Sequence, residues 1–273
     1  RPCQVGGLRS GCFPVNQRVI IIGLVAIVIL SGLGLFWWRI TMDEPVNTAL
    51  RSANVPFTSE KLVIDGRLDE PAWGDAVVVG PFVLSDGSAK APLACTARLM
   101  WDDDALYVGF EAVDRDLISP HTERDDPIYT KDVVEIFLDP EGDERDYMEL
   151  QVSPRGVIFD ARFPSYREDL PKSQKWNAPG LRVATTVAGS LDDGDGDEGW
   201  TAEFRILFAA LNRDTPKPNE TWRANLFRID VHEEGAHYTA WTPPLVGDFH
   251  TLDRFGYLRF VRPPGSGEPT LSP

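Results

Sequence analysis

The stretch Ile64-Asp65-Gly66-Arg67-Leu68-Asp69-Glu70-Pro71-Ala72-Trp73 holds the densest set of local structural signals in this chain of 273 residues. It predicts a short strand, then a tight turn at Asp65-Gly66 and a brief helical turn. Asp69 can cap that helical turn, and Pro71 suits one of its first positions. Trp73 then brings a large apolar ring beneath the turn. The stretch therefore predicts the entry into a folded domain rich in strands.

The sequence that follows alternates between apolar and polar residues with a period of two. At 133–138, Val134, Ile136 and Leu138 share one face and Glu135 points to the other. Short helical turns are indicated at 71–74 and 207–211. Strands recurring at this spacing predict an all-β, antiparallel β-sandwich. The other ranges with the pattern are 94–101, 106–113, 147–153, 157–163, 181–187, 200–206, 222–230, 238–242 and 256–261.

An uncharged run, residues 19–38, lies near the start of the chain. As a helix it would span roughly 30 Å, the hydrocarbon thickness of a bilayer, which predicts a single transmembrane helix. Arg1, Arg9 and Arg18 precede the run and no acidic residue does, so we expect a cytoplasmic N-terminus and a periplasmic or extracellular domain. A cleaved signal peptide is the alternative, but its apolar part is typically only about 7–15 residues long.

The remaining segments follow from composition. We expect a cytoplasmic segment at 1–18, a linker without periodicity at 39–58, one domain at 59–261 and a disordered tail rich in Pro, Gly and Ser at 262–273.

The formal net charge of −15 argues against a nucleic-acid partner, because phosphate contact needs a basic surface. Among the three cysteines, Cys95 alone belongs to the exported part, so we expect a fold that does not rely on disulfides. The alternating apolar neighbours of Cys95 predict a small buried side chain, and a reactive thiol is the alternative.

Four blocks of the domain resemble family 9 carbohydrate-binding modules. Residues 64–73 resemble the opening signature of that family, 101–108 its hairpin, 132–139 a strand of the type Asp-x-Val-Glu-Ile-Phe, and 254–258 its closing Phe-Gly strand. The resemblance implies a jelly-roll or immunoglobulin-like sandwich that binds a glycan without catalysis and without a required cofactor. Such modules usually accompany glycosidases, which suggests a link to polysaccharide catabolism.

The resemblance also implies that a sugar is held between two aromatic rings, because the C–H groups of a pyranose pack on an aromatic plane. The matching positions are Tyr129 and Phe249, where the family has tryptophan. Glu135 matches the family's strand glutamate, and Gln151 stands in place of an arginine. Glutamine lacks the forked, charged donor set of arginine, so the binding mode differs from the usual one. From the residues alone, Tyr129 and Phe249 fit rim packing equally well.

Trp176 lies in a loop-like stretch, 174–180, and suits either a lid over the sugar or a plug of the core. Residues 192–198 carry alternate aspartates like the start of a calcium loop. An EF-hand needs Glu at loop position 12, and counting from Asp193 that position is Phe204, which favours an acidic hairpin loop instead. The resemblance implies structural calcium elsewhere, with the acidic turns near Asp102 or Asp139 as candidates and no assigned ligands.

The sequence also bears on functions other than sugar binding. No Gly-x-Ser-x-Gly motif, Cys-His pair or histidine cluster typical of metal catalysis occurs in the sequence, so we do not expect an enzyme. A haem-binding electron-transfer sandwich needs axial His, Met or Lys ligands, and the exported domain offers Met100, Met148, His121, His232, His237 and His250. A protein-interaction domain is a further alternative, because the changes to Tyr129, Phe249 and Gln151 would also follow the loss of a sugar site.

Overall fold

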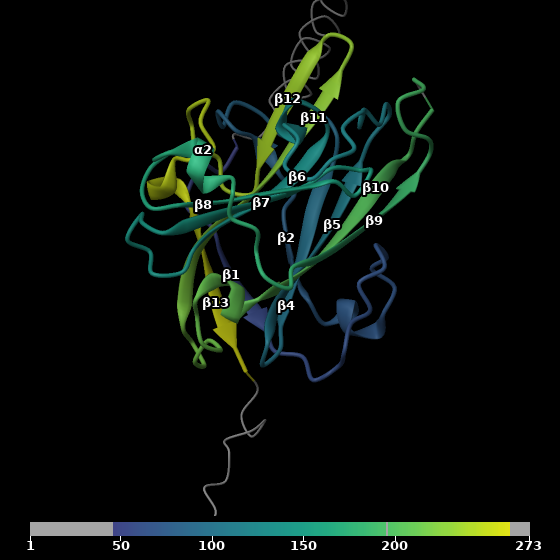
Figure 1. Cartoon of the computed structure of the whole chain (residues 1–273). Coiled ribbons are helices and arrows are strands. Elements are labelled where there is room, and N and C mark those ends of the chain that lie inside the picture. The colour runs from purple at the N-terminus through teal and green to yellow at the C-terminus, as the bar shows by residue number, and fades with distance from the viewer. Residues whose placement is uncertain (1–45, 195, 263–273) are drawn as a thin grey trace, which may run out of the picture. The chain divides into compact units, whose positions relative to one another are not determined.

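The computed structural model describes residues 46–194 and 196–262 (Figure 1). The predicted cytoplasmic segment 1–18 and transmembrane helix 19–38 lie outside these residues, as does the tail beyond Arg262. In the part of the chain that is described, no helix is both long and apolar enough to cross a bilayer.

The strands form two sheets (Figure 1), which confirms the predicted all-β sandwich. Every strand pair within them is antiparallel except β1 with β13, which is parallel. The smaller sheet has the order β2 (Val77–Val79), β4 (Cys95–Trp101), β5 (Ala105–Val113), β10 (Gly199–Leu207) and β9 (Arg182–Ala188). The larger has the order β1 (Ser52–Pro56), β13 (Gly256–Val261), β11 (Thr221–His232), β6 (Val133–Asp139), β7 (Tyr147–Val152) and β8 (Ile158–Phe163), and β12 (Gly235–Ala240) joins β11 to β3 (Val83–Leu84).

The main core lies between the sheets and follows from the period-two alternation. Val134, Ile136 and Leu138 of β6 pack in one cluster with residues of the smaller sheet such as Phe204. Cys95 belongs to the same cluster and is 1% exposed, which confirms the small buried side chain expected there. One face of each sheet is thus covered by the other sheet.

The opposite face of the larger sheet is also covered. Phe137, Tyr147, Phe163 and Phe227 form a second apolar cluster with residues of the segments that cross this outer face. All seven residues of β6 are consequently buried. This outer layer surrounds the candidate site.

The opening stretch folds largely as expected. Gly66 takes a positive φ of 88° in the predicted turn, and a 3₁₀-helix, η1 (Pro71–Gly74), begins at Pro71. Two expectations were wrong. Residues 61–64 form no strand, and Asp69 does not cap η1, whose N-cap position is Glu70 without a side-chain bond. The structure holds the turn from another element instead, through the buried carboxylate of Glu203 on β10.

The range 39–58, expected to be a linker, contains β1. Ala53 and Val55 are buried and pair β1 with β13 from the other end of the domain. Because that partner lies some 200 residues away in the chain, the local pattern gave no sign of this strand. Four short helical segments also cross the outer layer or loops, and only the region of η3 was predicted: η2 (Ile128–Thr130), α2 (Leu170–Ser173), η3 (Phe208–Leu211) and η4 (Leu252–Arg254).

Candidate functional site

A pocket of about 1040 Å³ opens on the outer side of the larger sheet. It brings together four residues singled out from the sequence, Tyr129, Glu135, Gln151 and Phe249. They come from four segments of the chain, the η2 turn, β6, β7 and the loop before η4. The convergence of residues so far apart makes this pocket the candidate functional site.

The register of β6 and β7 builds the floor of the pocket. Glu135 pairs with Gln151 and Phe137 with Glu149, so these four side chains lie on one face of the sheet. Glu135 is 2% exposed and Gln151 is 1% exposed. The enclosure of Glu135 between apolar neighbours, predicted from the alternation of β6, is confirmed.

The polar atoms of this floor are incompletely paired. The Gln151 amide donates a hydrogen bond to Oε1 of Glu149. Oε1 of Glu135 and Oε1 of Gln151 are buried and accept no hydrogen bond. Burial, followed by the nearby Glu149 carboxylate, raises the pKa of Glu135 well above its usual value, and burial raises the pKa of Glu149 to about 7. Buried acceptors without donors are costly, which points to a ligand that donates to them.

Aromatic rings form the walls. Tyr129 is 43% exposed, and its ring packs edge-on against Phe159 at a centroid distance of 5.6 Å. Phe249 stacks on Phe227 at 4.1 Å with an interplanar angle of 10°, and Tyr238, half exposed, meets it edge-on. Phe227 therefore covers one face of Phe249, while Tyr129 keeps much of its ring open to the pocket.

Charged groups occupy the rim. Arg167 donates to Oδ1 of Asp248 over 2.7 Å. His250 is buried, with Nδ1 2.7 Å from the Tyr147 hydroxyl and Nε2 3.6 Å from Oε2 of Glu149. Burial lowers the pKa of His250 to about 4, so the ring is neutral at pH 7. Arg167 is thus ion-paired with Asp248, and its charge reaches Glu149 of the floor only through space.

Trp176, the fifth sequence candidate, does not line this pocket. It packs against the main core between the sheets, in agreement with the core-plug interpretation. Sequence reasoning gave no role in the pocket to Glu149, Tyr238 or Arg167. Glu149 lies two residues before Gln151 on β7, so the alternation of the strand places both side chains on the same face, and this pattern could have predicted Glu149 in the pocket. Arg167 lies in a loop whose path no local pattern reveals.

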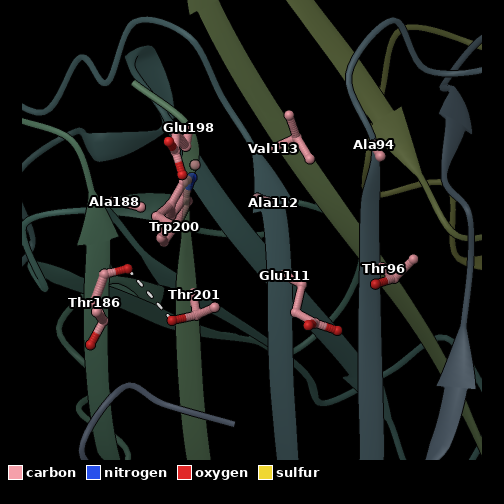
Figure 2. Close-up of a pocket in the computed structure, with 11 residues that line it drawn as sticks. Ala94, Thr96, Glu111, Ala112, Val113, Thr186, Ala188, Glu198, Trp200 and Thr201 are labelled. Atoms are coloured by element: carbon pink, nitrogen blue, oxygen red, sulfur yellow. Dashed lines mark hydrogen bonds between the residues drawn. The ribbon is translucent and has the colours of Figure 1, made fainter. Parts of the chain in front are cut away.

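A second pocket, of about 500 Å³, lies on the outer face of the smaller sheet (Figure 2). Strand register aligns Thr96, Glu111, Thr201 and Thr186 in a row across four strands. Its one aromatic lining residue, Trp200, is 3% exposed and belongs to the main core. Among the described residues, this groove has no open ring on which a sugar could stack.

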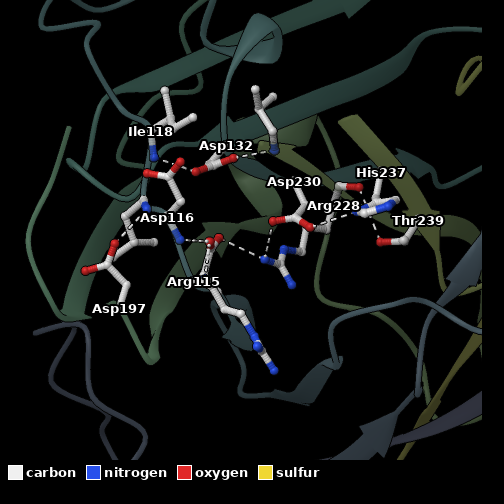
Figure 3. A network of polar contacts seen from close by, with 12 residues as sticks. Arg115, Asp116, Ile118, Asp132, Asp197, Arg228, Asp230, His237 and Thr239 are labelled. Atoms are coloured by element: carbon white, nitrogen blue, oxygen red, sulfur yellow. Dashed lines mark hydrogen bonds and ion pairs between the residues drawn. The ribbon is translucent and has the colours of Figure 1, made fainter. Parts of the chain in front are cut away.

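Asp114, Asp132 and Asp230 are the described carboxylates close enough together to share a metal ion. Figure 3 shows two of them, Asp132 and Asp230, beside Arg228. Their oxygens already have donors. Arg228 donates to Asp114 over 2.8 Å and to Asp230 over 3.0 Å, and both oxygens of Asp132 accept backbone N–H groups. Burial raises the pKa of Asp132 to about 8, which lowers the negative charge of the group near neutrality. In this structure two of the three carboxylates, those of Asp114 and Asp230, form a buried ion-pair network around Arg228.

The acidic turns proposed for calcium hold backbone amides instead. Asp102 accepts from the N–H groups of Asp104 and Ala105, and Asp139 accepts from those of Gly142 and Glu144. The described residues of the acidic stretch 192–198 lie between β9 and β10, which pair as antiparallel neighbours, so they belong to the hairpin connection favoured from the sequence. Phe204, at the position where an EF-hand needs a glutamate, lies in the main core.

The side chains offered for haem do not converge. Met148 lies in the main core and Met100 in a separate cluster near Trp73, so neither lines the pocket that contains His250. His232 and His237 lie against each other on the β11–β12 hairpin, with their ring centroids 4.4 Å apart. The haem alternative is not favoured.

A two-sheet sandwich with an aromatic-walled pocket on one sheet has the architecture of a non-catalytic carbohydrate-binding module. The chain belongs to the family described as carbohydrate family 9 binding domain-like, whose family model matches residues 64–262.

Three similar proteins accord with this assignment. The chain is 33% identical over 127 residues to Exoglucanase XynX of Acetivibrio thermocellus, a match that covers 46% of this chain and 10% of that enzyme. A family 9 module of Caldicellulosiruptor kristjanssonii solved with cellotriose shares 19% identity and a TM-score of 0.55, over 82% of this chain and all of that one. A putative carbohydrate-binding protein of Bacteroides uniformis shares 15% identity and a TM-score of 0.56, over 78% and 100% of the two chains.

Proposed function

We propose that this protein binds a glycan, or the end of one, without catalysis in the pocket between Tyr129 and Phe249. One observation carries the proposal: the aromatic and polar residues expected to contact sugar meet in one pocket whose buried acceptors lack donors. A pyranose supplies both complements, because its C–H faces pack on rings and its hydroxyls donate hydrogen bonds.

Each part of the pocket has a distinct task in this proposal. Tyr129 offers a half-open ring as the stacking platform, while Phe249 is fixed in place by its stack on Phe227. Glu135 and Gln151 accept from hydroxyls at the floor. Because the floor is built on paired strands, these acceptors are held in place before the ligand arrives, which reduces the entropy lost on binding.

The relatives suggest which glycans to try first. Structures of the Caldicellulosiruptor module contain cellotriose and glucose, so gluco-configured β-1,4 oligosaccharides are the natural starting set. The change from arginine to Gln151 and from tryptophan to Tyr129 and Phe249 argues for a ligand of somewhat different chemistry. The panel therefore needs to include xylan, mannan, chitin and chitosan fragments.

A glycan array followed by calorimetric titration tests the proposal. At least one glycan should bind, and Tyr129→Ala should weaken that binding by about tenfold through loss of ring stacking. Tyr257→Ala is the matched control, since Tyr257 is also about two-fifths exposed but lies on β13 outside the pocket. Absence of binding to every glycan, or equal loss in both variants, would contradict the proposed function.

We further propose that residues 19–38 anchor the domain to a membrane and present it outside the cytoplasm, where polysaccharide catabolism takes place. The apolar run and the arginines before it support this placement. An alkaline phosphatase fused after residue 273 should be active in cells, because this enzyme folds only outside the cytoplasm.

Sugar binding of this kind needs no cofactor. Structural calcium stays a prediction, and it is checked by comparing melting temperatures with and without EDTA.

A further inference from the structure

The floor of the pocket carries two carboxyl groups on neighbouring strands. Glu135 and Glu149 are diagonal neighbours on one face of the β6–β7 pair, within reach of each other's side chains. Among the described residues, no lysine or arginine forms an ion pair with either glutamate. Because the sheet buries both, water screens any negative charge that forms on them only weakly.

The floor also consists mainly of hydrogen-bond acceptors. Oε1 of Glu135 and Oε1 of Gln151 are buried and unpaired, and they belong to residues directly opposite each other across two strands. The one amide nearby, that of Gln151, already donates to Glu149. A ligand group that fits here brings several donors and no acceptor.

Arg167 acts on Glu149 through space, but no arginine or lysine is ion-paired with the floor in the described part of the chain. Arg167 is about half exposed at the rim and is paired with Asp248. His250 is neutral at pH 7, since burial lowers its pKa to about 4. Tyr129 and Tyr238 at the walls offer aromatic ring faces, which attract cations.

We propose that the pocket selects a pyranose that carries a protonated amine, an amino sugar, with its ammonium group placed against Glu135, Glu149 and the side-chain oxygen of Gln151. This inference rests on the sugar-binding function proposed above and narrows its ligand class. An ammonium group has three N–H donors and no acceptor, which matches this floor, whereas a hydroxyl donates a single hydrogen bond. Hydrogen bonds between charged groups are also stronger than neutral ones.

The proton balance of the floor supplies an independent signature. Burial and the neighbouring Glu149 raise the pKa of Glu135, so the pair of carboxyl groups retains a proton near neutrality. An ammonium group favours the ionised carboxylates. Binding of an amino sugar therefore moves a proton from the pair to the solvent, while binding of a neutral sugar leaves it in place.

Calorimetric titration with three matched trimers tests the proposal. The β-1,4-linked trimers of glucose, glucosamine and N-acetylglucosamine share one backbone and differ in the group at carbon 2. At pH 7 and with EDTA present, the glucosamine trimer should bind at least tenfold more tightly than the other two. Repeating the titration in two buffers of different ionisation enthalpy should show release of up to about one proton for that trimer alone.

Variants then locate the effect. Glu135→Gln should weaken binding of the glucosamine trimer more than that of the glucose trimer, and Glu149→Gln serves the same purpose if the first variant does not fold. Glu111→Gln removes an equal charge from the outer face of the smaller sheet (Figure 2) and should keep the preference.

The outcomes separate the two proposals. If the glucose trimer binds as tightly as the glucosamine trimer, or if Glu111→Gln removes the preference as Glu135→Gln does, the amino-sugar inference is overturned while sugar binding stands. If none of the trimers and no glycan of the wider panel binds, the proposed function fails and this inference fails with it.

Discussion

Glu203 and Glu135 are both glutamates on central strands with no more than 2% of their surface exposed, yet their oxygens have opposite surroundings. Oε2 of Glu203 accepts from the N–H groups of Asp65 and Gly66 at 2.9 and 2.7 Å, and Oε1 accepts from Nε1 of Trp73 at 3.1 Å. Oε1 of Glu135 accepts nothing.

This difference separates a structural residue from a ligand-binding one. Burial raises the pKa of both groups, but the three donors around Glu203 counteract the effect, whereas Glu149 reinforces it at Glu135. A buried carboxylate whose acceptors are filled by its own chain stabilises the fold. One left without donors destabilises the fold and is explained by a partner from outside. The opening turn thus belongs to the fold, and the pocket to the function.

The largest effect is expected at the turn that Glu203 holds. A Cβ at Gly66 would lie 2.5 Å from the carbonyl carbon of Thr185, and φ there is +88°. Gly66→Ala should lower the free energy of unfolding by about 3 kcal/mol or more through strain and overpacking. Gly74→Ala in the same stretch meets nothing within 4 Å and should be nearly neutral. Urea unfolding of both variants measures the contrast, and equal stability would contradict the structural role of the turn.

A smaller effect is expected from the charge of the pocket floor. Burial raises the pKa of Glu149 from 4.5 to about 7. Between these values the folded protein keeps a proton that the unfolded chain has released, so stability falls as the pH rises through this window. Glu149→Gln should make that slope shallower by up to about 1.4 kcal/mol per pH unit.

Urea unfolding at intervals of half a pH unit measures this slope. Asp132→Asn is the companion variant, because its pKa of about 8 predicts a change of slope that continues beyond pH 7. A Glu149→Gln profile parallel to that of the wild type would show that Glu149 does not titrate in this range.

The smallest effect is expected at the aromatic wall. Trp73 in the opening stretch donates a hydrogen bond from Nε1 to Glu203. Tyr129, by contrast, packs against Phe159 through its ring. Tyr129→Phe should change the free energy of unfolding by less than about 0.5 kcal/mol, as for other exposed positions. It should also leave the affinity for the best-binding glycan nearly unchanged. A large loss of affinity would show that the hydroxyl, and not the ring face, holds the sugar.

The sequence predicted the parts of this molecule that depend on local alternation. The strands around Val134 and Phe204 and the enclosure of Glu135 follow from a period of two, since one register places every side chain of a strand. Tyr129, Glu135, Gln151 and Phe249 were selected by resemblance, and the structure places them in one pocket.

What the sequence did not show depends on contacts between distant segments. The role of Glu203 is invisible in its own strand, because its donors lie some 130 residues earlier. The same holds for β1, whose partner is the last strand, and for Arg167, whose loop is placed by the outer layer. The missing partner of Glu135 is likewise apparent only once every neighbouring donor has been located.

The most direct test replaces the same atom in both glutamates. Glu203→Gln replaces one of the two acceptor oxygens with an NH2 donor that faces N–H groups, and it should lower the free energy of unfolding by about 2–4 kcal/mol. Glu135→Gln removes a buried carboxyl group that has no donors, so stability should stay the same or rise. Urea unfolding of the two variants beside the wild type at pH 7 gives the answer. A loss for Glu135→Gln as large as that for Glu203→Gln would show that Glu135 serves the fold, and would contradict the account.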